Sequence, residues 1–166
     1  LRIGHTSNGV SPGPIPCGVW EGVGYRPDTP EARPDDGISN SLESDKFSKT
    51  ATRIHYEAYA GKLAKLCGAL TGEVLNSVHI DSWEVGAQNW TAKLPEEFQQ
   101  RCGYSLRPYL PLLLTGCVID SVGKTERFLE DFRRTLQELL LENYFAYFRK
   151  LANNDGLELS VEAYHH

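Results

Sequence analysis

Several common functional signatures are missing from this sequence. No run approaches the roughly 18 apolar residues of a membrane span, so none is expected. No cluster of Lys and Arg occurs, and the net charge of −5 argues against a nucleic-acid-binding surface. The chain also lacks GxSxG, HExxH, EF-hand and phosphate-binding glycine motifs. These absences remove several hydrolase and nucleotide-binding classes from consideration for this segment.

The four cysteines include no CxxC pair, which disfavours a zinc site and leaves open whether they are free thiols or disulfides. Methionine is absent altogether, so Leu1 is not an encoded start and we expect the chain to be cut from a longer protein. Seven Gly and six Pro fall within residues 4–37, a density that blocks helices and central strands. We therefore expect residues 1–166 to be a single segment in which a loop region, 1–46, precedes regular units at 47–166.

Hydrophobic periodicity predicts alternating helices and strands after that loop. A helix capped by Ser48 is expected to carry an apolar stripe and to end near Gly68. The stripe consists of Ala51, Ile54, Ala58, Leu63 and Leu66. Further helices are predicted from Pro95 to Gly103, over 106–116 and over 125–153. Residues 75–83 and 157–164 alternate between apolar and polar side chains, which is typical of strands.

Strands joined by helical crossovers of this length are expected to be parallel and covered by helices. The faces opposite the helices carry His79 and Asp81 on the first strand, and Glu158, Ser160 and Glu162 on the second. Polar groups near strand ends suit the active face of a barrel better than an open sheet. The sequence thus predicts an α/β fold that is a partial (β/α)₈ barrel, because a closed barrel typically needs about 250 residues.

The densest group of reactive side chains lies in residues 81–91, where the first strand passes into its loop. Within it lie Asp81, Trp83, Glu84, Gln88, Asn89 and Trp90. Carboxylates can transfer protons, amides can bind sugar hydroxyls, and indole rings can stack on a sugar. The plainer alternative is a polar strand end with caps and buried Trp residues.

Glu162 ends the second predicted strand and is followed by Tyr164. Neighbouring parallel strands lie about 4.8 Å apart, so their end carboxyls could reach the roughly 5–9.5 Å separation used in glycoside hydrolysis. The alternative is a salt-bridged strand-end acid. Glu43 and Asp45 form a third acidic group that could reach the same cleft, bind a hard cation or flank a helix N-terminus. His79 points inward by parity, where a buried, hydrogen-bonded role is favoured over a catalytic one.

Three stretches of this sequence together resemble the α-L-rhamnosidases of glycoside hydrolase family 106. The middle one, HIDSWEVGAQNWT at 79–91, is long and compositionally unusual. The others are LESDKFSK at 42–49 and RFLEDFR at 127–133, the latter followed by matching positions up to 164. The order and spacing of these blocks are similar to the family's along nearly the whole chain.

The resemblance implies a (β/α)₈ catalytic domain within a larger secreted or periplasmic protein. It implies removal of terminal α-L-rhamnose from plant or microbial glycans with inversion, and a calcium ion in the site. Glu84 matches a catalytic carboxylate, here assigned as the acid, and Glu162 matches a site acid, although the catalytic partner could lie beyond residue 166. Asp81, Trp83, Gln88, Asn89, Trp90 and Tyr164 are the expected substrate contacts, and Glu43 and Asp45 are candidate metal ligands. The alternatives are a non-catalytic carbohydrate-binding piece of a barrel and an inactive structural piece.

Overall fold

The computed structural model describes residues 44–81 and 88–162, which form helices and one pair of strands. The helices are α2 (Lys49–Ala58), α3 (Ala60–Cys67), α4 (Leu94–Cys102), α5 (Leu110–Thr115), α6 (Val122–Leu140) and α7 (Ala146–Asn154). Short 3₁₀ turns cover Gly68–Leu70 and Arg107–Tyr109, and the strands are β1 (Ser77–Ile80) and β2 (Glu158–Val161).

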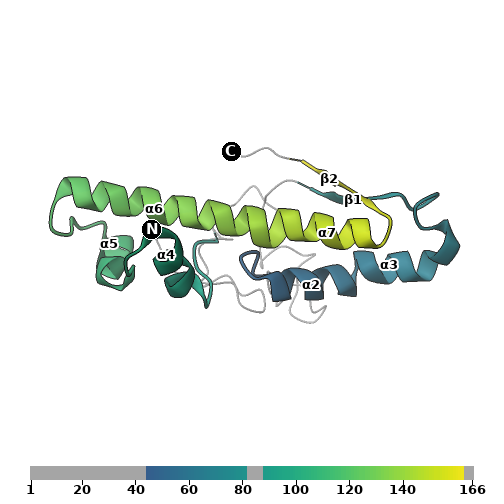
Figure 1. Cartoon of the computed structure of the whole chain (residues 1–166), viewed down its shortest axis with the longest axis horizontal. Coiled ribbons are helices and arrows are strands. Elements are labelled where there is room, and N and C mark those ends of the chain that lie inside the picture. The colour runs from purple at the N-terminus through teal and green to yellow at the C-terminus, as the bar shows by residue number, and fades with distance from the viewer. Residues whose placement is uncertain (1–43, 82–87, 163–166) are drawn as a thin grey trace, which may run out of the picture.

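One long helical rod spans the molecule, and the other elements pack along it (Figure 1). It begins after Ser121, whose hydroxyl accepts a hydrogen bond from the Lys124 amide. α6 and α7 are joined without a break by a π-helical turn, η5 (Leu141–Phe145). The helix predicted over 125–153 is therefore confirmed, with one turn of different winding inside it. A π turn re-aims the side chains around it and is common near functional sites.

The helix predicted from Ser48 to Gly68 is two helices. Ser48 caps α2 as predicted, accepting a hydrogen bond from the Ala51 amide. Tyr59 then leaves helical geometry, with φ −123° and ψ −84°, and α3 starts afresh at Ala60. The predicted stripe is wrong in part, because Ile54, Leu63 and Leu66 are exposed. The buried face consists instead of Thr52, Tyr56, Ala60, Gly61 and Ala64.

The two strands pair in parallel, as predicted, with Ser77 opposite Glu158 and Ile80 opposite Val161. They are shorter than predicted, because only four residues of each form the ladder. Their alternation is also confirmed: Val78, Ile80 and Leu159 pack against a buried cluster, whereas the polar residues between them are exposed. The partial (β/α)₈ barrel stays a prediction, since the described residues form a two-stranded parallel sheet within a mainly helical structure.

Side chains along the rod form two buried clusters. The aromatic cluster lies around α4, α5 and α6 and consists of Phe47, Leu94, Phe98, Leu106, Leu112, Leu113, Phe128, Phe132 and Leu139. The alanine cluster lies where α2 and α3 meet α7 and consists of Tyr56, Ala60, Ala64, Tyr144, Phe148, Ala152 and Leu157. The strands pack on the alanine cluster, and Figure 1 shows α7 between them and the α2–α3 pair. This second cluster therefore determines where the strand ends lie.

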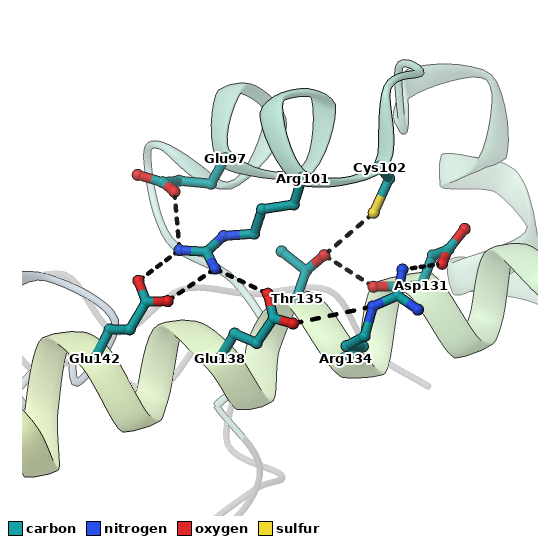
Figure 2. A network of polar contacts seen from close by, with 8 residues as sticks. All are labelled: Glu97, Arg101, Cys102, Asp131, Arg134, Thr135, Glu138 and Glu142. Atoms are coloured by element: carbon teal, nitrogen blue, oxygen red, sulfur yellow. Dashed lines mark hydrogen bonds and ion pairs between the residues drawn. The ribbon is translucent and has the colours of Figure 1, made fainter.

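Arg101 ties α4 to the rod through three carboxylates (Figure 2). Its guanidinium donates to Glu138 at 2.8 Å and to both oxygens of Glu142 at 3.0 and 2.7 Å. It also contacts Glu97, one turn earlier on α4, at 3.4 Å. The hydrogen bond from Arg101 lowers the pKa of Glu142. The pairing thus holds α4 against the end of α6 and the first residues of η5.

None of the helices in residues 44–81 and 88–162 combines the length and the apolar character that crossing a membrane requires.

Candidate functional site at the strand ends

The C-terminal ends of β1 and β2 bring three candidate residues together. The ladder continues one step past the strands, where the Glu162 amide donates to the Ile80 carbonyl at 2.9 Å. Asp81 and Glu162 therefore follow adjacent strand ends. One ligand atom from each of His79, Asp81 and Glu162 lies within 4.8 Å of the other two, and all three residues are exposed. The expectation that neighbouring strands bring acids to one place is met for Asp81 and Glu162.

His79 lies on the exposed polar face of β1 rather than in the interior, which corrects the prediction of a buried histidine. The predicted hydrogen bond does exist: its Nδ1 lies 3.1 Å from the Ser160 hydroxyl on β2. His79 is exposed because, among the described residues, the helices cover only the face of the sheet that carries Val78, and His79 lies on the other face. This contact links the two strands two residues before Asp81 and Glu162.

The donor atoms of this cluster fit a divalent cation in part. Carboxylate oxygens of Asp81 and Glu162 suit a hard ion such as calcium, whereas the imidazole of His79 suits a transition metal better. Calcium usually takes six to eight oxygen ligands, so two carboxylates would supply only part of its coordination. The candidate metal ligand Asp45 lies elsewhere and is buried, and its carboxylate accepts hydrogen bonds from Thr91 and from the Phe47 amide.

Residues after the strand-end loop are buried and bound to the segment before α2. Gln88 and Asn89 are each only 9% exposed. The Gln88 side chain accepts from the Lys46 amide at 3.2 Å and donates to the Ser44 carbonyl at 3.1 Å. Trp90 is partly buried and packs against the aromatic cluster. Their roles as substrate contacts stay predictions, and the amide of Gln88 already serves to hold the backbone.

Four of the predicted site residues, Glu43, Trp83, Glu84 and Tyr164, lie outside the described residues. Two residues that the sequence analysis gave no role are prominent in the structure. Thr91 donates to the buried carboxylate of Asp45 at 2.8 Å, and Asn143 in η5 donates to the Phe47 carbonyl at 2.7 Å. A signal for η5 was present in the sequence, because the apolar stripe of the long helix jumps from Leu140 to Phe145.

Comparison with known proteins identifies the family. The model of glycoside hydrolase family 106, described as alpha-L-rhamnosidase, matches residues 12–166. A protein of Formosa agariphila, provisionally named beta-glucuronidase, is 40% identical over 164 residues, which is 99% of this chain and 12% of that protein. The solved structure of a rhamnosidase from Novosphingobium sp. PP1Y is 36% identical with a TM-score of 0.66, over 74% of this chain and 12% of that one. The chain thus spans about an eighth of the length of either relative, and it belongs to glycoside hydrolase family 106.

Proposed function

We propose that this chain carries active-site acids of a glycosidase, and that the whole protein removes terminal α-L-rhamnose from plant or microbial glycans with inversion. The observation that carries the proposal is the meeting of Asp81 and Glu162 at the ends of two parallel strands. Such strand ends are where ligands bind in α/β folds. Glu84 follows Asp81 by three residues in the sequence, so the chain has a third acidic residue close to the end of β1.

In the proposed reaction Glu84 is the general acid, which gives its proton to the glycosidic oxygen as the bond to the anomeric carbon breaks. A second carboxylate, with Glu162 as the candidate in this chain, takes a proton from water as that water attacks the opposite face of the ring. The products are free rhamnose of inverted configuration and the released alcohol. Glu84 must remain protonated near neutral pH, and negative charge at Asp81 raises the pKa of a neighbouring acid.

The remaining residues of the site are proposed to bind the sugar. Trp83, Trp90 and Tyr164 offer ring faces for stacking, whereas Asp81 and Asn89 offer hydrogen bonds to hydroxyls. The amide of Gln88, the remaining expected contact, is instead used in two hydrogen bonds to the backbone. A calcium ion in the site, which the family resemblance implies, would supply positive charge that orients sugar hydroxyls. Asp81 is better placed to hold it than Asp45, whose oxygens already accept two hydrogen bonds, and Glu162 is left as the candidate base.

Charge favours a rhamnoside over a glucuronide as the substrate. The relative from Formosa agariphila carries a beta-glucuronidase name, and a glucuronide brings its own carboxylate into the site. The strand-end group holds two carboxylates and one histidine within 4.8 Å. A substrate carboxylate placed beside these two carboxylates would be repelled by them, so a neutral sugar such as rhamnose suits the group better. Aryl α-L-rhamnoside and aryl β-D-glucuronide should therefore be compared as substrates, each with added calcium and with a chelator.

The main test replaces the proposed acid in the full-length protein. Glu84→Gln should lower kcat on an alkyl rhamnoside by about 10³-fold, with little change in KM, because a positioned acid contributes about 10²–10⁴-fold. The loss should be smaller on a nitrophenyl rhamnoside, whose leaving group needs no proton. The matched control is Glu158→Gln, the same change at the opposite end of β2, which should leave kcat near the wild-type value.

Three outcomes of this test separate the parts of the proposal. Near-normal turnover of Glu84→Gln on both substrates would reject the role of Glu84. Equal losses on both substrates would move Glu84 from acid to base. NMR spectroscopy of the first product tests inversion directly, since an inverting enzyme releases the β anomer from an α-rhamnoside.

A further inference from the structure

A group of buried and half-buried polar side chains connects the segment before α2 with residues 88–91 and with η5, and it takes no part in the proposed chemistry. It consists of Asp45, Gln88, Thr91 and Asn143, called the polar latch below. Asp45 is 7% exposed and Thr91 5%, so both are removed from water. Charged and polar side chains are rarely buried to this extent unless their hydrogen bonds are made, because burial without partners costs free energy.

The first half of the latch joins residues 44–47 to the chain that returns from the strand-end loop. Gln88 spans two backbone groups, accepting from Lys46 and donating to Ser44. Thr91 donates to one oxygen of Asp45, and the other oxygen accepts from the Phe47 amide at 3.0 Å. Three hydrogen bonds thus cross this junction, and a fourth, within residues 45–47, orients the Asp45 carboxylate.

The second half joins the same segment to the π turn of the rod. Asn143 donates to the Phe47 carbonyl at 2.7 Å, and its own carbonyl accepts from the Thr52 hydroxyl of α2 at 2.9 Å. The Lys46 ammonium lies 5.6 Å from the centroid of the Tyr144 ring, which adds a cation–π contact. Residues 44–47 therefore lie between η5 and residues 88–91 and are bonded to both.

The latch acts on one end of the segment that contains Glu84, while the sheet acts on the other. Asp81 directly follows β1, whose end is paired with β2. Gln88 is the first described residue after that segment, and only six residues separate it from Asp81. The residues on either side of 82–87 are thus held, Asp81 by the end of the ladder and Gln88 by buried hydrogen bonds.

We propose that the polar latch positions the catalytic segment, with Thr91 and Gln88 as positioning residues that act through the segment carrying Glu84. This inference rests on the proposed function, because it concerns placement of the proposed acid. A satisfied buried network rigidifies its surroundings. Misplacement of a reacting group by about 1 Å can cost about 10²-fold in rate. The latch thus affects turnover without touching the substrate.

The experiment compares Thr91→Val, Thr91→Ser and Thr135→Val in the full-length protein. Thr91→Val keeps the shape but removes the hydroxyl, and Thr91→Ser keeps the hydroxyl. Thr135→Val is the matched control, since Thr135 is 1% exposed, donates at 2.8 Å to the Asp131 carbonyl within α6 and lies 3.6 Å from the Cys102 sulfur of α4. Should Thr91→Val fail to fold, Gln88→Met provides a second test by removing both Gln88 hydrogen bonds.

Thr91→Val should lower kcat by about 10-fold or more with little change in KM, which is the signature of misplaced chemistry rather than lost binding. The loss should be larger on alkyl than on nitrophenyl rhamnosides, because the misplaced group is the proton donor. Thr91→Ser should restore turnover, and Thr135→Val should lower the Tm without changing kcat. A purely structural hydroxyl would instead give Thr91→Val the same pattern as Thr135→Val, and that result would overturn the proposal.

A second readout keeps this inference distinct from the proposed function. If Glu84→Gln retains full activity, the proposed function fails, and the kinetic comparison loses its basis. Hydrogen exchange of the amides in residues 82–91 still tests the latch. Exchange there should be faster in Thr91→Val than in Thr91→Ser or Thr135→Val. Equal exchange in all three variants would overturn the latch whatever the enzyme acts on.

Discussion

The two buried clusters differ in the size of their side chains and in the elements that they hold together. The aromatic cluster is built from large rings, such as Phe128, which stacks on Tyr109 with centroids 4.4 Å apart, and Phe98, which meets Tyr104 edge-on at 5.1 Å. The alanine cluster brings Ala60 and Ala64 of α3 towards Ala152 of α7, and small side chains permit helices to approach closely. Both clusters stabilise the fold, but the strands pack only on the second among the described residues.

The difference indicates where stability and function are coupled in this chain. A change in the aromatic cluster alters a scaffold that does not contact the strands. A change in the alanine cluster moves the elements that carry Asp81 and Glu162. Away from Phe47 and Trp90, which adjoin the latch, the aromatic cluster should therefore behave as a stability region. The alanine cluster should behave as a region where stability and turnover change together.

The largest expected effect is in the aromatic cluster. Phe128→Ala should lower the free energy of unfolding by about 3–5 kcal/mol, because it removes a fully buried ring and leaves a cavity. Urea denaturation measures the loss, and kcat per folded molecule should stay at the wild-type value. A reduced kcat in protein that is still fully folded would contradict the separation of the two clusters.

Two tyrosines that donate to aspartates give a test with a smaller effect on stability. Tyr56 belongs to the alanine cluster, and Tyr104 packs against the aromatic cluster. Tyr56 donates to Asp155 at 2.8 Å beside β2, and Tyr104 donates to Asp131 at 2.9 Å beside α6. Changing either to Phe should cost about 1 kcal/mol of unfolding free energy. Only Tyr56→Phe should also lower kcat, since Asp155 lies in the turn that leads into β2. Equal effects of the two variants on kcat would remove the distinction.

The same pair predicts how stability falls at alkaline pH. Burial, with the hydrogen bond to the aspartate second, raises the pKa of both phenols. Their stabilisation is complete below the unfolded pKa of about 10 and is lost as pH rises from there towards the folded pKa. Unfolding free energies measured at pH 8 and above pH 10 should fall less steeply in the double Phe variant than in the wild type.

The smallest expected effect on stability concerns the ion pair between Arg101 of α4 and Glu142 of η5. Glu142→Gln should cost about 0.3–1 kcal/mol, since Glu142 is an exposed partner of Arg101. Arg101 lowers the pKa of Glu142, so this stabilisation is present above the ordinary value of about 4.3 and is lost as pH falls through the lower folded value. Denaturation at pH 7 and pH 3 measures the difference, with Glu96→Gln on α4 as the control. A cost that does not shrink at pH 3 would contradict the pairing.

Local patterns predicted much of the secondary structure but failed on the buried face of α2 and α3. Alternation identified β1 and β2, and Ser48 and Gly103 were correctly expected to cap or end their helices. The stripe failed because hydropathy ranks Leu66 above Ala64, whereas a close helix contact prefers the smaller side chain. The buried positions Thr52, Tyr56, Ala60 and Ala64 keep a spacing of four residues across the break at Tyr59.

The candidate site was predictable in part for a similar reason. Asp81 and Glu162 follow strands, and parallel pairing brings strand ends together whatever the intervening residues are. The latch was not predictable, because Asp45 meets Thr91 across 46 residues of sequence and Asn143 meets Phe47 across 96. No local periodicity encodes contacts between segments so far apart.

The sequence by itself determined which segments are helical or extended, which strand face is polar, and which family the chain resembles, because these follow from short-range spacing and composition. Only the tertiary structure decided that small side chains, rather than leucines, face α7. It alone decided that the buried side chains of Asp45 and Gln88 bond residues 44–47 to residues 88–91. Those outcomes depend on how closely distant segments pack, and packing distance is a property of the folded chain as a whole.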